Sequence, residues 1–67
     1  MEMKLLFLDT FESEFKGKKY CVYRFLDPTS LNVISGTDLN LSFVQYQIYK
    51  CKLEWRNNKL KVIEVIQ

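Results

Sequence analysis

A chain of 67 residues with a formal net charge of +2 is long enough for one small domain, which we expect to span residues 1–67. Leu, Ile, Val and Phe supply 23 of these residues, and this share excludes an intrinsically disordered chain. The sequence has no histidine and its two cysteines, Cys21 and Cys51, lie far apart, so a zinc site is excluded and no metal or other cofactor is expected.

The first predicted element is a long strand over Leu5–Phe15. Its start is apolar on both faces, whereas its second half alternates apolar and polar residues with the period of two that is typical of strands. We expect its far end to be a sheet edge or a projecting wing with Glu12 and Glu14 outward. Lys16-Gly17-Lys18 then predicts a turn, because glycine adopts positive φ without steric cost.

A second strand is predicted from Tyr20 to Leu26. Its alternation places Tyr20 and Arg24 on one face, beside the lysines of the turn. Asp27-Pro28-Thr29-Ser30 ends the strand, since proline donates no ladder hydrogen bond. Both cysteines occupy apolar positions, so buried free thiols are expected rather than a disulfide. The face that continues the core consists of Cys21, Tyr23 and Phe25.

Two weaker patterns precede the clearest one. Asn32–Ser35 predicts a short third strand, and Asp38–Val44 an irregular connection or another short strand. From Tyr46 to Arg56 charged residues alternate with apolar ones, which predicts a strand with one buried face. Tyr46 precedes a shift in this alternation, so its direction is left open. The residues expected to face the core are Tyr49, Cys51, Leu53 and Trp55.

Asn57-Asn58 predicts a two-residue hairpin turn, because asparagine tolerates the left-handed backbone that such a turn needs. This turn places Trp55 opposite Leu60, Glu54 opposite Lys61 and Leu53 opposite Val62, so apolar residues meet apolar ones and acid meets base. One bulged residue near Ile63 would then pair Lys52 with Glu64 and Cys51 with Val65. We therefore predict a bulge there.

The sequence predicts an all-β chain, because it contains five short strand patterns and no helical pattern. Two of the connections between these strands are predicted to be hairpins. A flat five-stranded sheet would leave two bare edges, which proteins remove by closure. The fold class we expect is a small five-stranded antiparallel barrel of the oligonucleotide-binding (OB) kind or of the SH3-like kind. A core of this size is worth about 3–5 kcal/mol, so dimerisation would be a natural supplement to stability.

Enzymatic function is not expected. The sequence has no histidine base and no Gly-rich phosphate loop, and the carboxylates of Glu12 and Glu14 are best explained as solvated surface. The apolar run Leu5–Leu8 is too short for a signal peptide or a membrane span. We therefore expect a cytoplasmic protein without membrane contact.

Basic residues concentrate in two segments, residues 16–24 and residues 50–67. A fold that brought the two segments together around Tyr20 would make one basic face. Unspecific single-strand binding needs such a positive groove together with aromatic faces for bases. From charge alone, two solvated strand faces are the better explanation.

Three parts of the sequence resemble the small single-stranded-DNA-binding proteins of filamentous phages and of phages and plasmids of Gram-positive bacteria. These parts are Gly17-Lys18-Lys19-Tyr20, the strand after it and the segment Tyr46–Ile66. The resemblance implies an OB fold, a homodimer and cooperative coating of single strands during replication. It also implies that Tyr20 contacts a base and that Lys16–Lys19 form a basic wing loop. The chain departs from that pattern in its shorter length, its low net charge and the lack of a long hairpin near residues 57–59.

Two functions of different classes remain. The first is unspecific single-stranded DNA binding, with RNA as an open alternative because the 2′-hydroxyl contact cannot be predicted from one chain. The second is a protein-interaction module of phage or plasmid origin, an accessory or inhibitor protein, docking through an apolar patch from Leu39, Leu41 and Phe43. For the first, Tyr20 would stack on a base, Arg24 would take either role, and the residues on phosphates would be Lys16, Lys18, Lys19, Lys50, Lys52 and Arg56.

Overall fold

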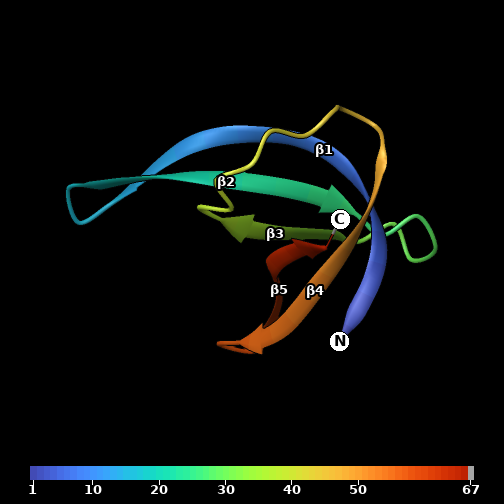
Figure 1. Cartoon of the computed structure of the whole chain (residues 1–67). Helices are drawn as coiled ribbons and strands as arrows, with labels where there is room; N and C mark the ends of the chain where they lie inside the picture. The colour runs from blue at the N-terminus through green and yellow to red at the C-terminus, as the bar shows by residue number, and fades with distance from the viewer. Residues whose placement is uncertain (67) are drawn as a thin grey trace.

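The computed structural model describes residues 1–66, which form five β-strands and no helix (Figure 1). The all-β prediction is confirmed, with the first strand beginning earlier and the third ending later than expected. The segment Asp38–Val44 forms no strand. The strands are β1 (Glu2–Phe15), β2 (Lys18–Leu26), β3 (Val33–Thr37), β4 (Ile48–Arg56) and β5 (Lys59–Ile66).

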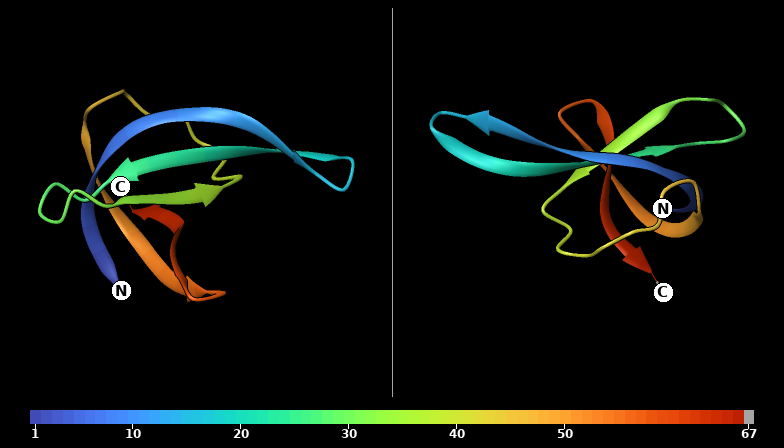
Figure 2. Two further views of the ribbon diagram at one scale, coloured as in Figure 1. Left: turned by 180° about the vertical axis from the view of Figure 1, so that it is seen from behind. Right: turned by 90° about the horizontal axis from the view of Figure 1, so that it is seen from above.

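The five strands are hydrogen-bonded in the order β1-β2-β3-β5-β4, and β1 also pairs with β4, so the sheet closes into a ring (Figure 2). β3 and β5 are parallel and pair only at Ser35–Lys61 and Gly36–Val62; the other contacts are antiparallel. The prediction of a wholly antiparallel sheet is therefore wrong. Directions cannot alternate around a closed ring with an odd number of strands, so at least one contact must be parallel.

Gly36 permits this closing contact. A Cβ atom built at this position would collide with the backbone carbonyl oxygen of Val62 in β5. Backbone atoms cannot move aside as the end of a flexible side chain can, so only glycine lets β3 approach β5 this closely.

Both predicted hairpin turns are present. Lys16 and Gly17 have φ of 52° and 78°, and Asn57 and Asn58 have φ of 52° and 63°, the backbone that two-residue hairpins favour. The β4–β5 register is also confirmed: Trp55 pairs with Leu60, Glu54 with Lys61 and Leu53 with Val62. The register shifts between Lys52 and Leu53, which leaves Ile63 as the predicted bulge.

The tip of the β1–β2 hairpin projects beyond the ring (Figures 1 and 2). β4 pairs only with residues 2–6 of β1, and β3 only with residues 22–26 of β2. Residues 12–21 therefore pair within a two-stranded ribbon; we call this ribbon, together with residues 10 and 11 at its base, the wing. The projecting wing expected at the end of the first strand is confirmed.

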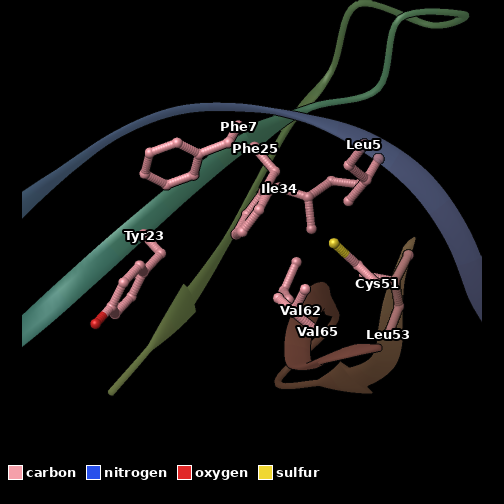
Figure 3. Packing of buried hydrophobic residues seen from close by; sticks show 9 residues of the cluster. All are labelled: Leu5, Phe7, Tyr23, Phe25, Ile34, Cys51, Leu53, Val62 and Val65. Atoms are coloured by element: carbon pink, nitrogen blue, oxygen red, sulfur yellow. The ribbon is translucent and has the colours of Figure 1, made fainter. Parts of the chain in front are cut away.

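The core lies inside the ring (Figure 3). Phe43, from the connection between β3 and β4, covers one end, with its ring centroid 5.2 Å from that of Phe7 and 5.6 Å from that of Tyr23. This packing explains why the connection is ordered without pairing as a strand. The buried hydrophobic residues are Leu5, Phe7, Tyr23, Phe25, Ile34, Cys51, Leu53, Val62 and Val65.

Two predictions about the core are wrong. Trp55 points to the inner side of β4 but lies next to the Asn57-Asn58 turn, beyond the end of the packed interior, and its side chain is 65% exposed. Cys21 is only half-buried because it lies where the wing leaves the ring. Both thiols are free, as expected, and Cys51 is fully buried. Burial raises the pKa of the Cys51 thiol to about 11.

Candidate nucleic-acid interface

A bulge in β1 decides which residues the wing presents. Phe7 pairs with Phe25, but Asp9 pairs with Arg24, so Leu8 is an extra residue. One inserted residue exchanges the two faces of a strand. Odd positions point into the core before the bulge and outward after it. Phe11 therefore lies on the outer surface with Arg24. The guanidinium of Arg24 is 5.9 Å from the centroid of the Phe11 ring.

The outward side of the wing carries three aromatic rings. Tyr20 lies opposite Ser13 and diagonally between Phe11 and Phe15, which are 48% and 64% exposed. Tyr20 itself is half-buried at the surface and lies outside the core cluster. We call this surface the wing face; its residues are Phe11, Phe15, Lys16, Lys18, Tyr20 and Arg24.

The wing face is basic as well as aromatic. The Lys16 ammonium lies 5.4 Å from the centroid of the Phe15 ring, and Lys18 is paired with Phe15 across the two strands. Within residues 1–66 neither lysine has a carboxylate in salt-bridge distance. Both charges are therefore available to an anion.

Arg24 is already engaged. Its Nε and Nη2 atoms donate to the two carboxylate oxygens of Asp9 at 2.7 and 2.5 Å. The hydrogen bond from Arg24 and its positive charge hold the pKa of Asp9 below its usual range. Since Asp9 matches its charge, Arg24 orders the base of the wing face and adds little net positive charge to it.

Lys19 lies on the other side of the wing. It pairs with Glu14 across the strands, and its ammonium is 3.9 Å from a carboxylate oxygen of Glu12. The bulge places these two glutamates on the inner side of the wing, whereas the sequence predicted them on its outer side. Lys19 is therefore separated from the aromatic rings by the hairpin itself.

Lys50 and Lys52 are also remote from the wing face. They lie opposite Lys4 and Glu2 of β1, and the Lys50 ammonium is 3.2 Å from a carboxylate oxygen of Glu2. Lys4 is ten residues before Glu14 in β1, which corresponds to about 33 Å of strand. The structure does not bring these two lysines to Tyr20, because they pair with the opposite end of β1.

A row of registered residues extends the basic surface from β2 to β5. Arg24 of β2 lies opposite Ser35 of β3, which lies opposite Lys61 of β5. Lys59 follows on the same side of β5, opposite Arg56, whose Nε atom is 3.5 Å from a carboxylate oxygen of Glu54. Of the predicted site residues, the structure thus gathers Lys16, Lys18, Tyr20 and Arg24 on the wing face, with Arg56 at the β4–β5 turn.

Sequence reasoning missed four residues of this surface. Phe11 and Phe15 alternate as core residues do, and only the bulge at Leu8 turns them outward. Lys59 and Lys61 alternate with apolar residues in a predicted hairpin strand, so their outward direction was available from the sequence. Their position beside β3 follows only from the closure of the ring.

The apolar patch expected from the β3–β4 connection is not formed as a unit. Leu39 and Phe43 pack against the core, and of the three residues only Leu41 is exposed. Apolar residues line up elsewhere on the outer surface, because Ile48 pairs with Leu6, Leu6 with Leu26 and Leu26 with Val33. We call Leu6, Leu26, Val33 and Ile48 the aliphatic stripe; it crosses four strands.

Comparison of the chain with known protein families, with characterised proteins and with solved structures found no match. The resemblance to phage single-stranded-DNA-binding proteins therefore stays a prediction from the residues quoted above. No helix among the described residues is long and apolar enough to cross a membrane.

Proposed function

We propose that the chain binds single-stranded nucleic acid, DNA in the first place, without sequence preference. The observation that carries this proposal is the wing face, where three aromatic rings lie beside two lysines that form no salt bridge in the described part of the chain. Stacking of one base on an aromatic ring is worth about 1–3 kcal/mol, and positive charges beside it hold the phosphates.

Lack of sequence preference follows from the side chains on this surface. Stacking accepts any base, because every base has a π-face, and lysines contact phosphates that are the same in every nucleotide. Phe11 and Phe15 carry no hydrogen-bonding group that would distinguish one base edge from another.

We assign the ring to the OB type. The long β1, which pairs with β4 at its start and with β2 at its end, and the parallel closure of β3 on β5 support this assignment. In OB folds the outer surface of the second and third strands and the two adjacent hairpin loops bind oligonucleotides. The wing is the first of these loops, and Asn57-Asn58 is the second.

Fluorescence anisotropy with labelled oligothymidylate tests the proposal, with duplex DNA and oligouridylate of equal length for comparison. We expect binding to the single strands that weakens with salt, with a slope of about −0.7 for each phosphate neutralised. Absence of binding at low salt, or binding unaffected by salt, would contradict the proposal. Stronger binding to oligouridylate would make RNA the substrate.

We further propose that the protein acts as a homodimer joined through the aliphatic stripe. Ile48 and Val33 at its two ends are exposed, and such a row of apolar side chains gains from being covered. Light scattering coupled to gel filtration should give the mass of two chains, and Ile48→Lys should reduce it to that of one. If the unmodified protein has the mass of one chain, the proposal of a dimer is refuted.

The aliphatic stripe also favours a second candidate function, docking of a different protein. In that case a pull-down would return one stoichiometric protein partner that survives nuclease treatment. Ile48→Lys would abolish this capture, and the wing face would have no role in it. Loss of the partner after nuclease treatment would instead favour nucleic-acid binding.

A further inference from the structure

A hollow lies away from the wing, where β3 and β5 separate. Its volume is about 510 Å³. The β2–β3 connection forms one wall with Ser30 and Asn32, and the β4–β5 hairpin forms the other with Trp55, Asn58, Lys59 and Lys61. The hollow exists because β3 and β5 pair at only two positions, Ser35–Lys61 and Gly36–Val62, and diverge beyond them.

Trp55 gives this hollow an aromatic wall. The side chain has the inward direction of β4, opposite Leu60, but it lies past the end of the core and is 65% exposed. Covering apolar surface of this size would gain free energy, because it would remove the surface from water. A flat ring stacked on the indole would do so.

Two lysines and one aspartate complete the wall. In the described part of the chain neither Lys59 nor Lys61 has a carboxylate in salt-bridge distance. Asp27 is the acid that lines the hollow, and its oxygens accept hydrogen bonds from the Thr29 amide at 3.0 Å and the Ser30 hydroxyl at 2.9 Å. Both donors are neutral, so Asp27 keeps its negative charge, but the two lysine charges exceed this single carboxylate charge and the lining as a whole favours an anion.

We propose that this hollow is a nucleotide subsite, in which a base stacks on Trp55 and its phosphate is held by Lys59 and Lys61. The side-chain amides of Asn32 and Asn58 line the same space, and amides can both donate to and accept from a base edge or a sugar. A heterocyclic ring joined to a phosphate matches this lining, because the ring would enter the gap between β3 and β5 to reach the inward-facing Trp55 while the phosphate stays at the outer surface with Lys59 and Lys61.

The position of the subsite indicates where its nucleotide comes from. Tyr20 and Lys61 are separated by four residues of β2 and two strand spacings, about 16 Å along the outer surface. Arg24 and Ser35 lie on this path, registered with Lys61. One bound strand can thus cover the wing face and the hollow, and this part of the inference rests on the proposed function. A free nucleotide presents the same chemistry, so the experiment has an arm for each source.

Trp55 is the single tryptophan of the chain, so its fluorescence reports on this hollow alone. We expect quenching on addition of oligothymidylate of about 16 nucleotides, the upper end of OB site sizes, and a separate titration with thymidine monophosphate tests the free nucleotide. Trp55→Ala should weaken oligonucleotide binding measured by anisotropy about 5- to 150-fold. Trp55→Phe should restore most of the affinity because it keeps a ring, and circular dichroism checks that each variant folds.

Variants of the two surfaces separate this inference from the proposed function. Phe15→Ser on the wing face should weaken oligonucleotide binding but leave the quenching at saturation intact, whereas Lys59→Gln with Lys61→Gln should weaken the quenching by either probe. Quenching by thymidine monophosphate without any oligonucleotide binding would keep the subsite, for free nucleotides, and refute the wing. Oligonucleotide binding with unchanged Trp55 fluorescence and an unaffected Trp55→Ala variant would overturn the subsite and leave the wing proposal standing.

Discussion

Two double variants with the same net charge can decide whether binding depends on the position of the cations or only on their number. Lys16→Gln with Lys18→Gln removes two charges from the wing face. Lys50→Gln with Lys52→Gln removes two from the opposite end of β1. Each pair reduces the formal net charge from +2 to zero. All four side chains are exposed, and surface ion pairs such as Lys50–Glu2 contribute about 0–1 kcal/mol, so both variants should fold.

The salt dependence gives the expected magnitude. Four lysines that form no salt bridge within residues 1–66 lie on the wing face and the β5 surface: Lys16, Lys18, Lys59 and Lys61. If each neutralises one phosphate, the slope of log affinity against log salt is about −2.8 for the unmodified chain and about −1.4 for the wing variant. Between about 50 and about 200 mM salt, the unmodified chain should then lose about 50-fold in affinity and the wing variant about 7-fold.

Anisotropy titrations of one labelled oligothymidylate over this salt range measure both slopes. The Lys50/Lys52 variant should keep the slope of the unmodified chain, because those charges lie about 33 Å of strand away from the wing tip. Equal loss of slope in the two variants would refute the reasoning, since binding would then depend on total charge and not on the wing face.

Three further results are expected. Tyr20→Ala should weaken oligonucleotide binding by about 1–3 kcal/mol, while Tyr46→Ala, an exposed tyrosine outside the wing, should change it little; equal effects would exclude stacking on Tyr20. Urea unfolding should show Gly36→Ala to be destabilised by about 3 kcal/mol, because the new Cβ collides with the Val62 carbonyl oxygen and a hydrogen bond between β3 and β5 is lost. Gly17→Ala, which has open space around it but a positive φ, should lose only about 1 kcal/mol. An unchanged stability of Gly36→Ala would show that β3 and β5 can move apart without cost. Burial raises the pKa of Cys51 to about 11, so the folded chain keeps a proton that the unfolded chain releases nearer pH 9, and the free energy of unfolding should fall as pH rises above about 9. Cys51→Ala should lack this part of the decline, and an identical pH profile of the two proteins would contradict the burial of the thiol.

The strands themselves were largely predictable because their evidence is local. Charged and apolar residues alternate on both sides of Asn57-Asn58, and only one register with one bulge satisfies the pairs from Arg56–Lys59 to Cys51–Val65. The closure between β3 and β5 was not predictable in this way. It depends on a contact between Gly36 and Val62, twenty-six residues apart, which leaves no periodic pattern.

Alternation indicates the face of a strand to which a side chain belongs, but not whether anything covers that face. Trp55 has the direction of a core residue and lies past the end of the core, so the period of two predicted the wrong burial. The same limit explains the error about Lys50 and Lys52. Their outward direction was clear, but which end of β1 they would meet was set by the register of β1 against β4.

The candidate site exists because a single bulged residue interrupts the alternation of inward and outward side chains in β1. Without the bulge at Leu8, Phe11 and Phe15 would continue the inward series of Leu5 and Phe7, and the acidic residues between them would face outward. The bulge instead places the rings on the same surface as Arg24 and the lysines of the turn, and moves the two acids to the inner side. Because the wing extends beyond the ring, no other strand covers these rings, and they remain available to the bases of a bound strand.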